Sequence, residues 1–371
     1  MTKARDLADL GNKTSLDEIN DAYDAGALSN RNMIINGAMQ VAQRGTSFTN
    51  NGYTVDRFRV ANGSVGNITT TQENTNSPSG VSKYSMKVTA TNTASLASGS
   101  DGWIRYVIET KDIENLTLSD TTKHFTVSFY VKCSNTGQSS IGVTSGNFSS
   151  AQYVYPFTID NANTWQKVSV AIPCSSLLSN VNGDYGLRLY WDIGAGTNYQ
   201  TSSTNQWVTG GTYAASGNLQ ITGVNGRYLQ ITGVQLEVGD TATPFEHRSY
   251  GDELAKCQRY CYVIQQQNNA ANSNASACNG TYYSATSFYG VLVFPTTMRV
   301  TPTMAVPTVT NGYRIYSATG ADLIDGSGFD MQSANKDNFC IYVPSVSSTA
   351  GFGGWMELIV AGAKITFDAE L

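Results

Sequence analysis

The residues that most often carry catalysis are sparse in this chain and have no matching partners. There are two histidines, His124 and His247, and a Ser/His/Asp triad or a metal site built on either would need distant partners that no motif identifies. Cys257 and Cys261 lie one helical turn apart, a spacing that could place two thiolates on a metal, but no matching Cys/His pair occurs elsewhere. We therefore predict no catalytic residue, no metal site and no cofactor, and we interpret these side chains as structural.

Carboxylates could serve a second kind of chemistry, the hydrolysis of glycosidic bonds. That reaction uses two carboxyl groups on opposite sides of the scissile bond. The candidate acids are isolated in the sequence and cannot be paired by inspection: Asp184, Asp192, Asp322, Asp325 and Glu357. Polysaccharide depolymerisation therefore stays an alternative without an identified catalytic pair.

Aromatic side chains suit a third kind of chemistry, the binding of sugars. Pyranose rings have apolar faces that stack on aromatic rings, and their hydroxyls match neutral amides and hydroxyls. The chain has 21 Tyr and 5 Trp, and we assign Trp165, Trp191 and Trp207 to the core because they lie in strand-like runs. Five tyrosines lie among Asn, Ser and Thr near the C-terminus, and we predict that they face outward and bind a glycan receptor: Tyr282, Tyr283, Tyr289, Tyr313 and Tyr316.

The low charge of the chain limits the classes of partner. Charged residues make up 14% of its 371 residues, where about a quarter is usual. The net charge of -5 argues against nucleic acid as a partner, because nucleic-acid binding requires clustered Lys and Arg. No apolar run is long enough for a transmembrane helix, and the first residues lack the apolar core of a secretory signal. We expect synthesis in the cytoplasm and reduced cysteines.

Short alternating segments predict a β-rich first domain between residues 31 and 248. In the run 123–132, Phe125, Val127, Phe129 and Val131 alternate with polar residues, which is the period of a half-buried strand. Similar runs occupy 165–172 and 185–193. Regular short strands with Gly, Asn and Ser turns are typical of a β-sandwich or jelly roll. No fixed repeat supports a β-helix.

A change of architecture is predicted between residues 230 and 260. The strand that carries Val234 and Leu236 ends at Gly239, and Pro244 keeps the residue before it out of helical geometry. We predict a helix from Gly251 to Gln266, capped by Ser249 or Asp252. Its packing face would consist of Leu254, Cys257, Tyr260, Cys261 and Ile264. Residues 268–279 are predicted to form a loop or linker, and strands resume in 281–300 and 314–365.

The first 30 residues form the other segment predicted to be helical. Ser15 precedes Glu18 by three residues, as in a capping box. The apolar residues of this segment are candidates for docking on a larger assembly: Leu7, Leu10, Leu16, Ile19 and Tyr23. A frayed terminus or an arm folded on its own domain is the alternative.

Several segments together resemble tail fibre proteins of tailed bacteriophages that contain a carbohydrate-binding-module-like jelly roll. The stretch ITGVQLEVGDTATPFEHRSYGDELAKCQRY (231–260) is similar to the end of that module, and NMIINGAMQVAQRG (32–45) with YTVDRF (53–58) is similar to its opening. FPTTMRVTPT (294–303) and the final DAEL (368–371) resemble the distal part of such fibres. The resemblance covers most of the chain. It implies an attachment segment (1–30), a jelly roll (31–248), a helix and linker (249–279) and a receptor-binding C-terminal β-domain (280–371).

The resemblance also implies a function and partners. The protein would be a homotrimer of the virion tail, attached to tail proteins by its N-terminus and bound without catalysis to a host surface polysaccharide or outer-membrane receptor. A structural connector such as a tail adaptor, collar or head fibre is an alternative. Many such modules hold a structural calcium, but the corresponding places here, 36–40 and 231–234, lack carboxylates. Whether calcium binds is left open.

Overall fold

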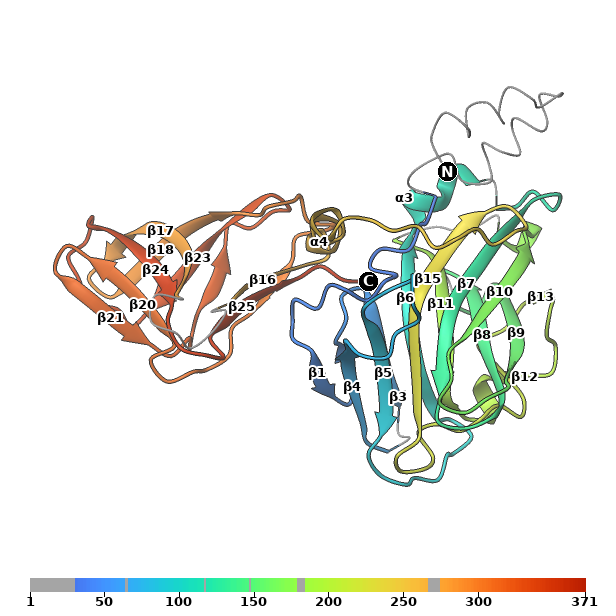
Figure 1. The fold of residues 1–371 in the computed structure, drawn as a ribbon. Coiled ribbons are helices and arrows are strands. Elements are labelled where there is room, and N and C mark those ends of the chain that lie inside the picture. The colour runs from blue at the N-terminus through green and yellow to red at the C-terminus, as the bar shows by residue number, and fades with distance from the viewer. Residues whose placement is uncertain (1–30, 64–65, 117, 147, 179–183, 266–273) are drawn as a thin grey trace, which may run out of the picture. The chain divides into compact units, whose positions relative to one another are not determined.

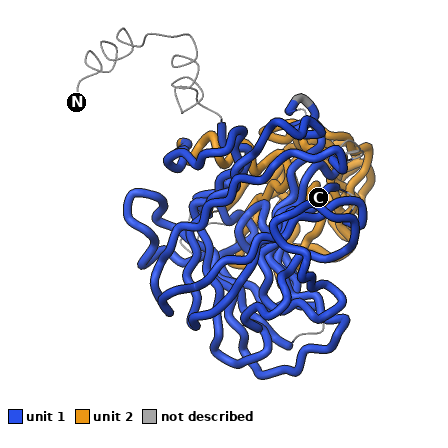
Figure 2. Tube along the Cα trace, turned by 90° about the vertical axis from the view of Figure 1, so that its right-hand side faces the viewer, with its two compact units in different colours: residues 1–248 blue, residues 249–371 orange. Residues whose placement is uncertain are grey.

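Two compact units make up the chain, the first ending at Arg248 and the second running from Ser249 to Leu371. The computed structural model describes residues 31–371 except 64–65, 117, 147, 179–183 and 266–273. The predicted attachment residues Leu7, Leu10, Leu16, Ile19 and Tyr23 therefore lie outside the described part. Figure 1 labels the elements, and Figure 2 colours the two units.

Unit 1 is a sandwich of two antiparallel sheets, which we name sheet A and sheet B (Figure 1). Sheet A has the order β1 (Ser47–Thr49), β4 (Ile68–Glu73), β5 (Ser85–Ala90), β15 (Tyr228–Val238), β7 (His124–Cys133) and β10 (Gln166–Pro173). Sheet B has the order β13 (Trp207–Val208), β9 (Gln152–Ile159), β8 (Gly137–Ser145), β11 (Tyr185–Ala195), β6 (Asp101–Glu109), β3 (Phe58–Gly63) and β2 (Gly52–Tyr53). A short pair, β12 (Gln200–Thr201) with β14 (Ala214–Ala215), and a single-turn helix, α3 (Thr110–Ile113), complete the regular elements that we name in this unit.

The core of unit 1 forms where the inner faces of the two sheets meet. The four alternating apolar residues predicted to face inward from β7 are all buried, as a half-buried strand requires. Trp191 of β11 is fully buried, and its ring centroid lies 5.5 Å from that of Phe129. The prediction of a mainly β protein with a β-sandwich is thus confirmed.

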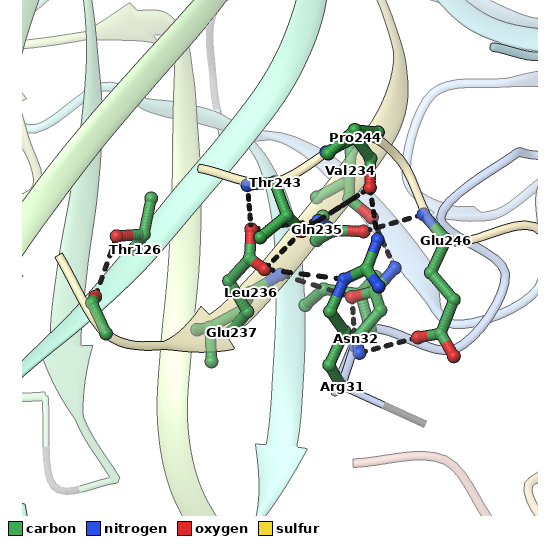
Figure 3. Close-up of polar contacts among 12 residues, drawn as sticks. Arg31, Asn32, Thr126, Val234, Gln235, Leu236, Glu237, Thr243, Pro244 and Glu246 are labelled. Atoms are coloured by element: carbon green, nitrogen blue, oxygen red, sulfur yellow. Dashed lines mark hydrogen bonds and ion pairs between the residues drawn. The ribbon is translucent and has the colours of Figure 1, made fainter. Parts of the chain in front are cut away.

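A polar network joins the first described residues of unit 1 to its last strand and the segment after it, and Figure 3 shows its contacts. Asn32 donates from Nδ2 to the Val234 carbonyl (3.2 Å) and accepts from the Leu236 amide (3.1 Å). The Asn32 amide itself donates to Glu246 Oε2 (2.7 Å). The first described residues are therefore bound to the last strand and to the segment that follows it.

Glu237 is the charged member of this network that the last strand contributes. Its carboxylate accepts from the Thr243 amide (3.0 Å), from Thr243 Oγ1 (2.6 Å) and from Gln235 Nε2 (2.9 Å). Arg31 Nε lies 3.6 Å from it in an ion pair, with the Glu237 side chain 2% exposed. We call Asn32, Gln235, Glu237, Thr243 and Glu246 the terminal clasp. It satisfies polar groups that unit 1 would otherwise bury without partners.

The predicted helix after the clasp is shorter than expected. Helix α4 spans Tyr250–Gln258, and Ser249 Oγ accepts from the Asp252 amide (3.1 Å) as its N-cap. The prediction that it continues to Gln266 is wrong, because Cys261–Gln265 form strand β16. The run CYVIQ contains an aromatic and two β-branched residues, which favour a strand over a helix.

Unit 2 contains two sheets, D and E. Sheet D has the order β16, β25 (Lys364–Asp368) and β19 (Thr303–Ala305). Sheet E has the order β21 (Gly320–Ile324), β20 (Tyr313–Ser317), β24 (Gly353–Leu358), β17 (Ala275–Ser284), β18 (Ser287–Val293), β23 (Asn338–Pro344) and β22 (Asp330–Gln332). Phe288 and Phe339 of sheet E share one core with Phe367 of sheet D. The prediction of a loop up to Asn279 is wrong from Ala275 onward, because strand β17 begins there.

Candidate functional site

Two of the five tyrosines predicted to face outward lie in the core of unit 2. Tyr282 and Tyr313 are 1% and 0% exposed. The Tyr282 hydroxyl donates to Asp322 Oδ2 (3.0 Å), and the Tyr313 hydroxyl donates to the carbonyls of Pro307 (3.0 Å) and Lys364 (3.1 Å). Burial raises the pKa of each to about 12. The outward prediction is wrong for this pair, because consecutive strand residues face opposite sides and composition does not say which side is inner.

The other three predicted tyrosines lie on the opposite face of sheet E, where they form two separate aromatic groups. Tyr283 is 76% exposed, and its ring centroid lies 5.3 Å from that of Tyr289. Tyr316 stacks on Trp355 with 4.5 Å between centroids. We call Tyr283, Tyr289, Tyr316 and Trp355 the outer aromatic face. Because none of the four is fully buried, this face could contact a partner.

A second candidate lies in unit 1, on the face of sheet A that points away from the core. A pocket of about 530 Å³ opens there. We call it the sheet-A pocket, and its lining is Glu73, Thr75, Asn76, Lys87, Lys132, Asn163, Trp165, Tyr228 and Gln230. The strands place Lys87, Lys132 and Tyr228 outward because their neighbours Val88, Val131 and Leu229 are buried in the core.

The middle of the sheet-A pocket is one row of residues across three strands. Gln230 of β15 pairs with Lys87 of β5 on one side and with Lys132 of β7 on the other. The Gln230 amide is held in place, since its Nε2 donates to Ser85 Oγ (2.6 Å). Adjacent strands lie about 4.8 Å apart, so the two lysine Cα atoms are separated by about 10 Å.

Two aromatic rings lie beside the lysines. Lys87 Nζ is 4.5 Å from the centre of the Tyr228 ring, and Lys132 Nζ is 4.9 Å from the centre of the Trp165 ring. The Tyr228 hydroxyl donates to Asn163 Oδ1 (2.6 Å), and Trp165 Nε1 donates to the Asn76 carbonyl. These bonds fix the orientation of both rings.

The electrostatics of the pocket are dominated by its two ammonium groups. Burial and the positive charge of Lys87 lower the pKa of Lys132, and the negative charge of Glu73 opposes this effect. Glu73 Oε1 accepts a hydrogen bond from Thr71 Oγ1 (2.7 Å). Within the described residues, neither lysine has a carboxylate within ion-pairing distance.

Sequence reasoning missed the sheet-A pocket. It assigned Trp165 to the core, and this was wrong, since Trp165 is only half-buried and lines the pocket. Trp191 does lie in the core, and Trp207 is partly buried against it. The alternation in 123–132 could have indicated that Lys132 faces outward. The pairing of β15 with both β5 and β7, which brings Lys87 and Lys132 together, cannot be read from any short stretch of the sequence.

The acids and cysteines considered for catalysis or metal binding have other roles where their contacts are known. Asp192 is buried and accepts from Asn218 Nδ2 (2.7 Å), while Asp322 and Glu357 accept from Tyr282 and Arg314. Cys257 and Cys261 are buried in different elements, a helix and a strand. No group of three His, Cys, Asp or Glu side chains in the described ranges could hold a metal ion. No helix there has the length and apolarity to cross a membrane.

Comparisons with known proteins give weak similarities. No family model matches the chain, and no curated protein matches its sequence. Among solved structures, the enzymatically active domain of tailspike protein 4 of bacteriophage CBA120 is 11% identical over 56% of this chain and 21% of its own length, with a TM-score of 0.31. A CBM4 domain is 10% identical over 55% of this chain and 97% of its own length, with a TM-score of 0.28. The family 11 carbohydrate-binding module of a Clostridium thermocellum cellulase is 12% identical over 53% and 89%, with a TM-score of 0.22. None of these similarities identifies a family for the chain.

Proposed function

We propose that this chain is a phage tail-fibre protein that binds host-surface glycans without catalysis, and that the sheet-A pocket is its main sugar-binding site. The observation that carries the proposal is the set of side chains in that pocket. Two orientated aromatic rings, Trp165 and Tyr228, line the pocket together with the amides of Asn163 and of Gln230, which is 3% exposed. Such a set matches a sugar, whose ring is apolar and whose hydroxyls bond to neutral amides.

The size of the pocket supports the proposal. Its volume of about 530 Å³ lies within the roughly 300–1,000 Å³ of small-ligand sites. Five of its nine lining residues lie on strands of sheet A, namely Glu73, Lys87, Lys132, Tyr228 and Gln230. The loop residues Asn163 and Trp165 are held by hydrogen bonds to Tyr228 and to the Asn76 carbonyl. Preorganised groups lose little conformational entropy on binding.

The absence of a reaction is part of the proposal. Glycoside hydrolysis ordinarily uses two carboxyl groups, whereas Glu73 is the one carboxylate among the described residues that line the pocket. Adhesion needs no more than binding, and several weak sites suffice when copies are linked, because linked copies bind with avidity. A homotrimer attached to the tail by residues 1–30 would supply that multiplicity.

The biological setting rests on sequence. The segments 32–45, 231–260 and 294–303 resemble tail fibre proteins, and this resemblance supports a role on the virion with a partner on the host surface. The outer aromatic face of unit 2 is the second place where this partner could bind. The Tyr316–Trp355 stack favours it, because a stacked, partly exposed pair presents an apolar surface to a sugar ring.

A point-variant comparison in the full-length chain tests this proposal. We would measure retention in affinity electrophoresis through gels cast with neutral polysaccharides (dextran, galactomannan, a β-1,3-glucan) and acidic ones (polygalacturonate, alginate, hyaluronate, a phosphomannan). Trp165→Ala is compared with Trp355→Ala, a matched removal of a half-exposed Trp in the other unit. We expect retention by at least one polymer, lost in Trp165→Ala and kept in Trp355→Ala.

Other outcomes identify the alternatives. If retention were lost in Trp355→Ala and kept in Trp165→Ala, the sugar-binding site would lie in unit 2. Retention by no polymer would contradict glycan binding and favour a structural connector. Release of oligosaccharides from a retained polymer would contradict the non-catalytic part and favour a depolymerase.

A further inference from the structure

We propose that the sheet-A pocket selects sugars that carry an anionic group, a carboxylate or a phosphate, and that Lys87 and Lys132 bind this group. The inference rests on the proposed function and deepens it, because it names the chemical class of the ligand. A neutral-sugar site would need the amides and the aromatic rings but not two ammonium groups.

The first argument is geometric. Lys87 and Lys132 pair with the same residue, Gln230, from opposite sides. Their stems therefore leave the sheet on the same face, and both lysines line the same pocket. With Cα atoms about 10 Å apart, two flexible four-carbon stems can bring their ammonium groups to one anion between them.

The second argument concerns charge. In a chain with 14% charged residues and a net charge of -5, the described lining of this pocket has two positive groups against one carboxylate, Glu73. Glu73 lies beyond ion-pairing distance of both lysines among the described residues. The site thus has a local positive excess without a matching internal counter-charge, and an anionic ligand would supply it.

The third argument comes from the aromatic rings. Each ring has an ammonium group over it, at 4.5 Å from the centre of the Tyr228 ring and 4.9 Å from that of Trp165. A neutral sugar that stacked on these faces would have to displace both ammonium groups without bonding to their charge. An anionic sugar offers each lysine a stronger partner, since charge-assisted hydrogen bonds exceed the exposed cation–π attraction.

The ionisation of the site agrees with this assignment. The titratable groups that line the pocket are Glu73, Lys87, Lys132 and Tyr228. Burial and Lys87 both disfavour the charged form of Lys132, and its pKa is lowered despite Glu73. A bound anion would reverse this effect, because an opposite charge nearby favours the ammonium form.

The experiment uses the same gels and the full-length chain, at about 0.15 M salt to screen long-range attraction. The double variant Lys87→Met/Lys132→Met removes both charges and keeps most of each stem, and Lys87→Arg/Lys132→Arg keeps the charges. The control is Lys111→Met, because Lys111 is an exposed residue of α3 and its replacement removes a positive charge outside the pocket. Thermal unfolding of each variant verifies that it is folded.

We expect the wild type to be retained by an acidic polymer, with an apparent dissociation constant raised at least about tenfold in the Met double variant. The Arg double variant should keep part of the retention, and Lys111→Met should match the wild type. Comparing retention by polygalacturonate with retention by the phosphomannan distinguishes a carboxylate from a phosphate on the bound sugar.

Three results would overturn the inference. The first is retention by neutral polymers alone, which would leave the proposed function standing. The second is an acidic retention that the Met double variant does not weaken, which would place the anion site elsewhere. The third is retention by no polymer, which would remove the proposed function together with the inference.

Discussion

Lys87 and Lys132 lie in one row of sheet A, each directly opposite Gln230 of the central strand β15. Their separation is set by backbone register and not by a loop, so the positive pair is present whether or not a ligand is bound. Strand residues packed from behind by Val88 and Val131 cannot move apart without breaking the sheet. The two ammonium groups therefore stay close together in the folded state, and their mutual repulsion lowers the stability of the fold.

Replacing Lys132 with Met should stabilise the protein at neutral pH. Burial and Lys87 lower the pKa of Lys132 below its ordinary 10.5, so the folded state holds this proton less tightly than the unfolded state. The free energy of unfolding of the wild type should then rise as the pH increases through the window between the lowered pKa and 10.5. The Met variant lacks this titration, and we expect its Tm to exceed that of the wild type at pH 7, with a difference that shrinks toward pH 10.5.

Thermal unfolding at several pH values measures this effect. Lys111→Met is the control, and its Tm should follow that of the wild type. A lower Tm for Lys132→Met at pH 7 would show that the contact of Lys132 with the Trp165 ring outweighs the cost of burying its charge.

Replacing Glu237 with Ala should destabilise unit 1 by about 3 kcal/mol, as expected when one partner of a buried charged network is removed. Glu237 accepts three hydrogen bonds and lies 3.6 Å from Arg31 Nε (Figure 3). The substitution leaves the Thr243 amide and the Gln235 side chain without this acceptor. Urea unfolding measures the change.

The matched control for the clasp is Asp240→Ala. Asp240 lies in the exposed turn after β15 and accepts from Thr241 Oγ1 (3.1 Å), so its loss should stay within roughly 0.5 kcal/mol. If both variants unfolded at the same urea concentration, the clasp would not be a major source of stability for unit 1.

The sequence predicts where the strands of unit 1 lie better than it predicts which strands are adjacent in a sheet. Phe125, Val127 and Phe129 alternate so regularly that their inward direction follows from the two-residue period alone. The pocket depends instead on β5, β15 and β7 lying side by side, although Lys87, Lys132 and Gln230 are far apart in the chain. No local pattern encodes that order, because pairing is decided by how whole faces pack.

Local ambiguity explains the other errors. Cys257, Tyr260, Cys261 and Ile264 are all buried, which fits the spacing of a helix, yet the last two lie in β16. A short apolar run fits both structures, and here sheet pairing with β25 decides between them. Trp165 shows a similar ambiguity, since it immediately precedes β10 and its strand-like context did not reveal that it borders a surface pocket.

Removing the hydroxyl of Tyr282 should destabilise unit 2, whereas removing that of Tyr283 should not. Tyr282→Phe loses the bond to Asp322 (3.0 Å) and should lower the free energy of unfolding by about 1 kcal/mol. Tyr283→Phe makes the same chemical change at a side chain that is 76% exposed, and it should stay within roughly 0.5 kcal/mol. Urea unfolding of the two variants is the measurement. Equal losses would contradict the assignment of Tyr282 to the core and Tyr283 to the surface.

Replacing Arg314 with Met should raise the pKa of Glu357 on the outer side of sheet E. Burial alone would raise this pKa, but hydrogen bonds from Arg314, Trp355 and Asn274, with the charge of Arg314, bring it below its ordinary 4.5. Arg314 Nη2 contributes the shortest contact, at 2.7 Å from Glu357 Oε2. A carboxyl whose pKa is lower in the folded state than in the unfolded state stabilises the fold at pH values above the unfolded-state pKa. This stabilisation is lost as the pH falls through the folded-state pKa. Wild-type unit 2 should therefore lose more stability between about pH 5 and pH 3 than the Met variant does.

NMR titration of the Glu357 side chain follows the pKa directly. Asn274→Ala is the graded control, because it removes only the neutral hydrogen bond to Oε2 (3.2 Å) and should raise the pKa less than Arg314→Met. A pKa that did not change in Arg314→Met would mean that Trp355 and Asn274 alone hold the carboxylate in its charged form. The Tyr316–Trp355 stack would then be anchored to Glu357 without help from the ion pair, since Trp355 Nε1 donates to its Oε1 (3.3 Å).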